Sequence, residues 1–271
     1  MDRTVSAAGF APAELEIAAL ANAKAILLDW DGCASIANQP FAMTIEFLDV
    51  YGDRVVIVSN NSTLLPSDIA EALAKAGANF PAERVLLAGC EAIITAAESG
   101  RDVRTLVIGP SRMKAFAKKN NLNLVQKDIE LVVLLRDTRF SYAKLDRAVQ
   151  ALRQGARLIV ANPDKTHPGL NGALVPETGA LFAAIAACVD LETIDVAVIG
   201  KPSAGLFEKA CRSLNATPDQ AVMIGDNPLT DIAGAQAVGM GSILVAPGSS
   251  LTLKDLLPPQ ASWSQRAAQR V

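Results

Sequence analysis

Nine short apolar runs alternate with stretches of helical spacing, and this alternation constrains the fold more than any other feature of the chain. The runs are rich in Val, Ile and Leu and end in polar turns, which is typical of strands buried on both faces. In chain order they occupy residues 25–28, 54–59, 84–89, 104–109, 131–135, 157–161, 195–200, 221–225 and 242–246. Between most of them lie amphipathic stretches with Ser, Thr or Asp ahead and Gly or Asn behind, such as 66–77, 141–155 and 203–215. This pattern predicts an α/β fold with mainly parallel sheets.

The number of predicted strands bears on how many domains the chain forms. Nine strands are many for a single open sheet in a chain of 271 residues, since most sheets have about four to six strands. With 51% hydrophobic residues, the chain can build real cores. We therefore expect two sheets in two domains.

Composition excludes several classes of partner. The 25 basic and 28 acidic residues are well mixed and give a net charge of −3, so no basic stripe suggests nucleic acid or an anionic membrane surface. The four cysteines are far apart and form no C-x-x-C pair, which fits small core residues in a reducing cytoplasm. The longest apolar run has ten residues, and Glu14 and Glu16 interrupt the apolar N-terminal segment. We expect neither export nor membrane spanning.

Polar side chains follow four of the apolar runs, where ligands of open parallel sheets usually bind. They are Asp29 and Asp31, then Ser59, Asn60 and Asn61, then Lys201, and finally Asp226 and Asp231. Each group also has a plain structural interpretation: Asp-Gly is a common turn, the Ser-Asn-Asn segment suits a helix cap, and Lys201 suits a solvated helix entrance. Asp226 could form a turn, and Asp231 could favour a helix N-terminus. Trp30 should point away from its two acidic neighbours and pack in the core.

The single histidine, His167, narrows the possible chemistry. Metal centres with several imidazoles are impossible, and a Ser-His-Asp triad would need this one residue. The sequence has no G-x-S-x-G elbow and no G-x-G-x-x-G after a strand. Carboxylates, a lysine, a hydroxyl group and a metal remain as the reacting groups.

This set of groups suits the hydrolysis of phosphate monoesters. A carboxylate nucleophile can approach phosphorus only when cations neutralise both partners, and Lys201 with Mg²⁺ would do so. Asp29 and Asp226 with a main-chain carbonyl suit the oxygen coordination of Mg²⁺. Asp29 would then form an aspartyl-phosphate, while Asp31 would protonate the leaving oxygen and later deprotonate the hydrolytic water.

Four segments resemble, in order and spacing, the motifs of the haloacid dehalogenase-like superfamily of phosphatases. They are "DWDG", "VSNNS", "GKPSAGLFEKA" and "GDNPLTDIAGAQAVGM". Residues 131–169 and 176–189 further resemble the cap of its NagD-like branch, which includes p-nitrophenyl phosphatases and pyridoxal phosphate phosphatases. The resemblance implies a Rossmann-like core from residues 1–84 and 191–271 and an inserted α/β cap at 85–190.

The resemblance also implies roles for individual residues. Asp29 corresponds to the nucleophile and a metal ligand, and Asp31 to the acid/base that lends a main-chain carbonyl to the metal. Ser59 and the Asn60 amide correspond to the phosphate-holding motif, where we also place Asn61. Lys201 would orient Asp29, Asp226 would bind the metal directly, and Asp231 would hold water or Lys201. In the cap, the loop 162–169 matches one that often contacts substrate, with Asn162, Asp164 and His167 as candidates and a purely structural role as the alternative.

Two segments depart from the family pattern. Cys33-Ala34-Ser35 replaces the usual residues after Asp-x-Asp-Gly, and Pro176-Glu177-Thr178-Gly179 replaces a P-G-[TA]-G segment of the cap. The first leaves every catalytic atom in place, and the second lies near the domain junction. Substrate preference therefore cannot be transferred from relatives.

We predict a cytoplasmic, Mg²⁺-dependent phosphatase of small phosphorylated metabolites, such as sugar phosphates, with a possible homodimer formed through the cap. The alternatives are a dehalogenase, a phosphomutase and a non-enzymatic phospho-accepting receiver domain. A dehalogenase has no need of Asp31, because only a poor alkoxide leaving group requires an acid. A receiver domain has about half this length and a different motif order.

Overall fold

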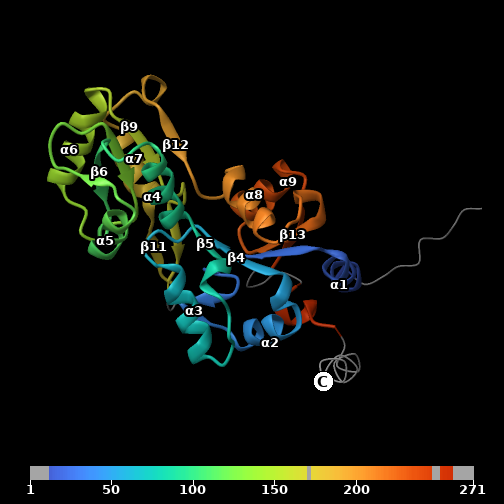
Figure 1. Ribbon diagram of the computed structural model, residues 1–271. Coiled ribbons are helices and arrows are strands. Elements are labelled where there is room, and N and C mark those ends of the chain that lie inside the picture. The colour runs from blue at the N-terminus through green and yellow to red at the C-terminus, as the bar shows by residue number, and fades with distance from the viewer. Residues whose placement is uncertain (1–11, 170–171, 246–250, 259–271) are drawn as a thin grey trace, which may run out of the picture.

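Two five-stranded parallel sheets organise the computed structural model, which describes residues 12–169, 172–245 and 251–258 (Figure 1). The first sheet has the order β14-β13-β1-β4-β5. Its strands are β1 (Ala25–Leu28), β4 (Val55–Ser59), β5 (Val85–Leu87), β13 (Ala221–Gly225) and β14 (Gly241–Leu244). The helices around it are α1 (Pro12–Asn22), α2 (Ala42–Tyr51), α3 (Pro66–Lys75), α8 (Ala204–Ser213) and α9 (Ala233–Ala237).

Alternate side chains of β1 show why its sequence is continuously apolar. Ile26 and Leu28 pack with the side chains of α2 and α3, whereas Leu27 packs with α8 on the opposite face. Successive strand residues point to opposite faces, so a strand covered on both sides must be apolar at every position. All four β1 residues are buried. Strand β1 is therefore packed on both faces up to its last residue, directly before Asp29.

The second sheet is inserted between β5 and α8 and has the order β12-β9-β8-β6-β7. Its strands are β6 (Arg104–Ile108), β7 (Asn123–Leu124), β8 (Leu131–Leu134), β9 (Arg157–Val160) and β12 (Val196–Val198). Its helices are α4 (Ala88–Glu98), α5 (Ser111–Lys119), α6 (Tyr142–Arg153) and α7 (Thr178–Ala186). Helices α4 and α5 contribute to a core shared with the first sheet, while α6 and α7 cover the other face of the second. The fold is therefore a Rossmann-like parallel core with an inserted α/β cap.

The membership of two strands corrects the predicted domain boundaries. The predicted limits at 84/85 and 190/191 would place residues 85–87 in the cap and residues 196–198 in the core. Instead, β5 pairs with β4 in the core sheet, and β12 pairs with β9 in the cap sheet. A short apolar run indicates that a strand is buried but carries no information about which neighbour it pairs with, so the sequence pattern could not assign these two strands.

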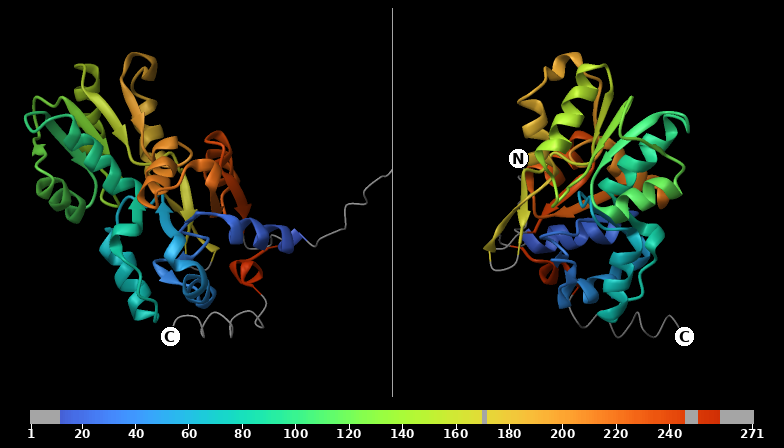
Figure 2. Two further views of the ribbon diagram at one scale, coloured as in Figure 1. Left: turned by 45° about the vertical axis from the view of Figure 1, so that its right-hand side comes forward. Right: turned by 90° about the vertical axis from the view of Figure 1, so that its left-hand side faces the viewer.

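Two short antiparallel pairs add to the parallel sheets. Strands β2 (Ser35–Ile36) and β3 (Gln39–Pro40) form a hairpin next to β1, and its two turn residues, Ala37 and Asn38, have φ of 49° and 61°. Strands β10 (Thr166–Pro168) and β11 (Leu174–Pro176) form a second pair. Figure 2 shows this second pair, in yellow, extending from the cap toward the core.

The buried side chains test two smaller predictions. Trp30 is fully buried, as predicted, and its indole nitrogen donates a hydrogen bond to Asn38 Oδ1 at 3.1 Å. Cys33, Cys90 and Cys211 are buried, but the prediction is wrong for Cys188, which is exposed near the end of α7. Within the described ranges, no helix is both long enough and apolar enough to cross a membrane.

Candidate active site

A tight turn directly after β1 positions the two carboxylates of "DWDG". The Asp29 amide donates a hydrogen bond to Ile224 O at 2.9 Å, so Asp29 continues the pairing of β1 with β13. The chain then folds back, and the amides of Ala34 and Ser35 both donate to Trp30 O. Gly32 has φ of +100°, and a Cβ at this position would overlap the carboxylate of Asp226. Only glycine adopts this positive φ readily and has no Cβ to collide with Asp226.

Lys201 is the buried cation of the site. Its Nζ lies 2.5 Å from Asp29 Oδ1 and 2.7 Å from Asp231 Oδ1, and it donates a hydrogen bond to Val58 O at 3.0 Å. The side chain is almost completely buried. Burial alone would lower the lysine pKa, but the carboxylates of Asp231 and Asp29 outweigh it and raise the pKa above its usual value. Lys201 therefore remains charged over the whole physiological range.

The segment that precedes Lys201 belongs to the cap sheet. After β12 ends, the amides of Ile199 and Gly200 still donate hydrogen bonds to Val160 O and Ala161 O, in continuation of the pairing with β9. A Cβ at Gly200 would collide with Asn60 Oδ1 and Ala161 O. Lys201 is thus the first residue after the hydrogen bonds of the cap sheet end.

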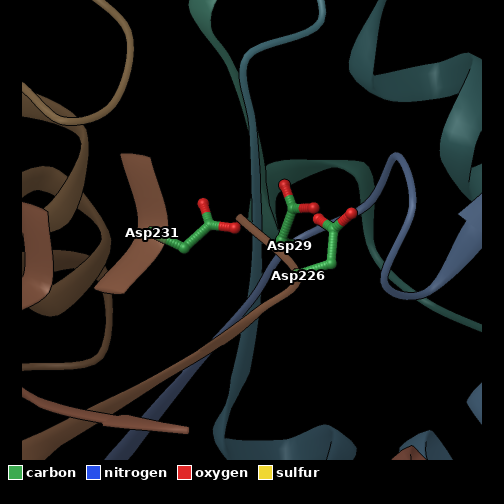
Figure 3. Close-up of side chains that lie close together, drawn as sticks. All are labelled: Asp29, Asp226 and Asp231. Carbon is green, nitrogen blue, oxygen red and sulfur yellow. The ribbon is translucent and has the colours of Figure 1, made fainter. Parts of the chain in front are cut away.

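Three carboxylates meet at the carboxyl end of the core sheet. Figure 3 shows Asp29, Asp226 and Asp231 directed toward one another from three separate segments, and one oxygen of each carboxylate lies within 4.8 Å of the other two. Asp226 follows β13, and Asp231 lies in a π-helical turn, Pro228–Ile232, where its Oδ2 accepts a hydrogen bond from the Asn227 amide at 3.1 Å. The fold therefore brings together three carboxylates that the sequence predicts to belong to one site.

The charges of this cluster are only partly balanced. Burial raises the pKa of Asp29 well above its usual range against the opposing effect of Lys201, and burial followed by the charge of Asp231 raises the pKa of Asp226 to about 6. Three carboxylates face one ammonium group, which leaves an excess of negative charge in a buried place. Carboxylate oxygens are the donors that hard divalent cations prefer, so the residues fit such an ion.

Asp231 differs from the other two carboxylates in its partners. One of its oxygens pairs with Lys201, and the other accepts from the Asn227 amide. This leaves Asp29 and Asp226 as the carboxylates with more capacity for a cation.

Asp31 is held apart from the cluster by the segment after β4. Its Oδ2 accepts hydrogen bonds from Ser59 Oγ at 3.2 Å and from Asn61 Nδ2 at 3.1 Å. Ser59 Oγ in turn accepts from the Asn61 amide at 3.0 Å, so the Ser59 hydroxyl group contacts both Asp31 and Asn61. The two carboxylates that are separated by one residue in sequence therefore have different environments: Asp29 faces a lysine, and Asp31 faces neutral donors.

Asn60 connects the core to the cap instead of pointing at Asp31. Its Oδ1 accepts from the Lys201 amide at 2.8 Å, and its Nδ2 donates to Lys201 O at 3.0 Å and to Asp164 Oδ2 at 2.9 Å. Asn162 Nδ2 donates to Asn60 O at 2.7 Å and to Thr178 Oγ1 at 3.2 Å. Thr178 Oγ1 also lies 3.0 Å from Ser62 Oγ, which adds a second core–cap contact.

The pocket above the carboxylates is lined by residues of both the core and the cap and has a volume of about 80 Å³. Of the sequence-predicted residues, Asp164 and His167 line it from the cap side, whereas Asn162 is fully buried and does not. The predicted substrate contact of Asn162 is thus not supported by its position, because its amide is occupied by core–cap bonds. The pocket is also lined by Glu177, which the sequence showed only as a departure from the family pattern, and by residues that were not named as candidates, which are Thr166, Pro168, Asn227 and Thr230.

The sheet order, the carboxylates at its carboxyl end and the inserted cap define a haloacid dehalogenase-like hydrolase. Residues 26–123 match the family described as haloacid dehalogenase-like hydrolase, and residues 198–262 match the HAD-hydrolase-like family. The chain belongs to this superfamily and is a phosphatase of its NagD-like branch.

Individual relatives match this chain over most of its length, and those with solved structures share its fold. The 5'-nucleotidase YutF of Bacillus subtilis is 28% identical over 83% of this chain and 88% of its own length. The solved structure of NagD from E. coli K-12 is 25% identical, with a TM-score of 0.71 over 88% of this chain and 93% of that chain. The glycerol phosphate phosphatase of Mycobacterium tuberculosis, solved in complex with magnesium, is 24% identical, with a TM-score of 0.76 over 88% and 77% of the two chains.

Proposed function

We propose that the protein hydrolyses small phosphate monoesters with Mg²⁺ through a phosphoenzyme at Asp29. The observation that carries this proposal is the division of work between the two carboxylates of one turn. Asp29 contacts Lys201 beside Asp226, whereas the carboxylate of Asp31 accepts from Ser59 and Asn61. A nucleophile next to cations and a separate acid/base are what the two half-reactions of such a phosphatase require.

The first half-reaction would transfer the phosphoryl group to the enzyme. A carboxylate oxygen of Asp29 attacks phosphorus, the bond from phosphorus to the ester oxygen breaks, and Asp31 gives its proton to the departing alkoxide. Mg²⁺ held by Asp29, Asp226 and the main-chain carbonyl of Asp31 would supply positive charge that offsets the phosphate oxygens. Lys201 adds a fixed charge beside Asp29.

The second half-reaction would release phosphate. Asp31, now ionised, takes a proton from a water molecule while the oxygen of that water attacks phosphorus. The bond between phosphorus and the Asp29 oxygen breaks. Asp31 is then protonated again for the next cycle. Asp231 would keep Lys201 in place throughout, since it is buried and pairs with the ammonium group at 2.7 Å.

The cap would restrict the substrates. We propose a catalytic domain of residues 12–87 and 201–258 and a cap of 88–200, drawn from sheet membership. Cap residues form part of the pocket wall, and a volume of about 80 Å³ is well below the ~300–1,000 Å³ of pockets that take drug-sized ligands. Two of the relatives described above are named as a 5'-nucleotidase and a glycerol phosphate phosphatase. This pocket favours the smaller of these leaving groups.

The proposal is tested with p-nitrophenyl phosphate as a surrogate substrate. The wild type should release p-nitrophenol with Mg²⁺ and lose turnover in EDTA, and Asp29→Asn should be inactive with the metal present. Asp49→Asn, on the exposed face of α2, is the matched control and should retain full activity. Activity in Asp29→Asn equal to that of the control would refute the mechanism, and stoichiometric transfer of phosphate to a sugar instead of its release would indicate a phosphomutase.

A further inference from the structure

The side chain of Asn60 holds the main chain of Lys201 at two points. Its Oδ1 accepts a hydrogen bond from the Lys201 amide at 2.8 Å, and its Nδ2 donates to Lys201 O at 3.0 Å. One carboxamide group therefore binds both main-chain polar groups of the same residue, as the opposite residue does in an antiparallel ladder. A Cβ at Gly200 would lie 2.5 Å from Asn60 Oδ1, so the glycine before Lys201 allows the carboxamide to approach this closely.

The partners of Asn60 fix the direction in which its carboxamide points. Nδ2 also donates to Asp164 Oδ2 at 2.9 Å, so both of its hydrogens are used, and Oδ1 faces an N–H group. A flipped carboxamide would set its oxygen against a carbonyl and a carboxylate, so only one orientation is compatible with these contacts. The side chain has no N–H left for a phosphate oxygen. A phosphate contact of Asn60 would therefore involve its main-chain amide.

The end of strand β4 also holds the other end of the same lysine. Lys201 Nζ donates to Val58 O at 3.0 Å and lies 2.5 Å from Asp29 Oδ1. Val58 and Asn60 are two residues apart in one segment, so this segment binds both the ammonium group and the main chain of Lys201. Lysine carries its charge on a flexible four-carbon stem. Fixing both ends of the residue restricts where the charge can lie, and here it lies against Asp29.

Two side chains of the cap loop bind Asn60 from the other side. Asp164 Oδ2 accepts from its carboxamide, and Asn162 Nδ2 donates to Asn60 O at 2.7 Å. Asn162 is fully buried, and its Oδ1 accepts from the Asp164 amide at 3.1 Å, so the two cap residues also hold each other. The Gly179 amide, in the first turn of α7, donates to Asp164 O at 2.8 Å. The cap loop is thus connected through Asn60 to the main chain of Lys201.

We propose that Asn60 is a positioning residue for phosphoryl transfer. Its carboxamide fixes the main chain of Lys201 so that the ammonium group lies against Asp29, and Asp164 fixes the carboxamide from the cap. Asn60 contributes to kcat and not to substrate binding, because the three hydrogen bonds of its side chain are all made to the protein. A displaced ammonium group would offset less of the negative charge between nucleophile and phosphate. This inference rests on the proposed function, because it concerns the rate of that same reaction.

The first test measures hydrolysis of p-nitrophenyl phosphate with Mg²⁺ by Asn60→Ala. A displacement of ~1 Å in a reacting group can lower a rate by about 10²-fold, so kcat should fall by about tenfold to 10²-fold. KM should stay within threefold of the wild-type value. Asn79→Ala, which changes an exposed residue of the loop after α3, is the matched control and should keep kcat within twofold. Urea unfolding of both variants measures how much of each loss comes from unfolded protein.

A double variant tests whether Asn60 acts through Lys201. Lys201→Met should by itself lower kcat by about 10²- to 10³-fold, the range found when one charge-stabilising donor is removed. Without the ammonium group there is nothing left to place, so adding Asn60→Ala should cost less than threefold more. An equal loss in both backgrounds would show that Asn60 acts on the substrate or on the fold and would overturn the proposal. A rise in KM with unchanged kcat in Asn60→Ala would overturn it as well.

An exchange of two side chains tests the link to the cap and keeps the lysine. Asn60→Asp has the same shape and keeps an acceptor for the Lys201 amide, but its second oxygen would face Lys201 O and the Asp164 carboxylate. Its kcat should fall at least tenfold, because two donors are lost. Adding Asp164→Asn places an NH₂ group opposite that oxygen and should raise kcat at least fivefold above that of Asn60→Asp.

The exchange also tests the proposal if the cavity left by Asn60→Ala unfolds the protein, because Asn60→Asp conserves the volume of the side chain. Wild-type kcat in Asn60→Asp, or no recovery when Asp164→Asn is added, would overturn the proposal. Absence of any ester hydrolysis by the wild type with Mg²⁺ would instead refute the proposed function itself.

Discussion

The carboxylate of Asp226 should make the metal-free protein less stable at neutral pH. Burial and the neighbouring Asp231 raise its pKa from 3.8 to about 6. Since each unit of pKa difference is worth about 1.4 kcal/mol, ionisation of this group costs the folded state about 3 kcal/mol at pH 7.5. Asp226→Asn removes the charge with almost no change in shape. We therefore expect the variant to unfold with a free energy up to about 3 kcal/mol higher than that of the wild type in EDTA.

The pH dependence gives this prediction its sign. The folded-state pKa of Asp226 lies above the unfolded value, so between about pH 4 and pH 6 the folded chain binds more protons than the unfolded chain. The free energy of unfolding of the metal-free wild type should therefore fall as the pH rises through this window. The advantage of Asp226→Asn should shrink from about 3 kcal/mol at pH 7.5 to below about 1 kcal/mol at pH 4.

Urea unfolding in EDTA at both pH values measures this difference, with Asp49→Asn on the exposed face of α2 as control, expected to change stability by less than about 0.5 kcal/mol. Added Mg²⁺ should stabilise the wild type at pH 7.5 but not Asp226→Asn, because a ligand stabilises only the state that binds it. A metal-free Asp226→Asn that is less stable than the wild type at pH 7.5, or equally changed at both pH values, would refute the reasoning.

Two further substitutions test the turn after β1. Asp31→Asn should lower kcat for glycerol 1-phosphate by about 10²- to 10⁴-fold, which is the usual contribution of a general acid or base. The loss of kcat should be smaller for p-nitrophenyl phosphate, because its leaving group needs less protonation. Equal losses for the two esters would contradict the role assigned to Asp31. Gly32→Ala should lower activity at least tenfold and destabilise the protein by about 1–3 kcal/mol, because its Cβ overlaps the Asp226 carboxylate at φ of +100°; steady-state kinetics and urea unfolding measure both effects, and a fully active, stable variant would contradict the geometry.

The apolar runs predicted nine of the ten strands in the two described parallel sheets, because most of these strands are buried on both faces; β7, which has only two residues, was missed. Strand β1, with every residue buried, is the clearest case. The two short antiparallel pairs were not predicted, since β2 and β3 have only two residues each and β10 alternates exposed and half-buried side chains. Strands β5 and β12 were predicted as strands but assigned to the wrong sheets, because pairing depends on contacts far away in sequence.

The candidate site followed from the sequence where side chains come directly after a strand. Asp29 and Asp226 lie at such positions in β1 and β13 and meet in the structure. The function of Asn60 as a link between Lys201 and the cap could not be predicted, since it depends on how the two domains meet. Glu177 was noticed only as a departure from a pattern, and a buried acid at a helix start has no sequence signal that separates it from an ordinary cap residue.

The position of Lys201 directly after the cap sheet has a consequence for protein engineering. Chimeras that exchange caps between phosphatases would need their second junction after Gly200, because the hydrogen bonds of the cap sheet extend to that residue. A junction at 190/191 would leave β12 with the recipient core and expose the edge of β9. The cap sheet and Lys201 are consecutive in the chain, so a transplanted cap that sits at a slightly different angle would also displace the ammonium group from Asp29. Such a hybrid would then lose turnover although its catalytic residues are unchanged.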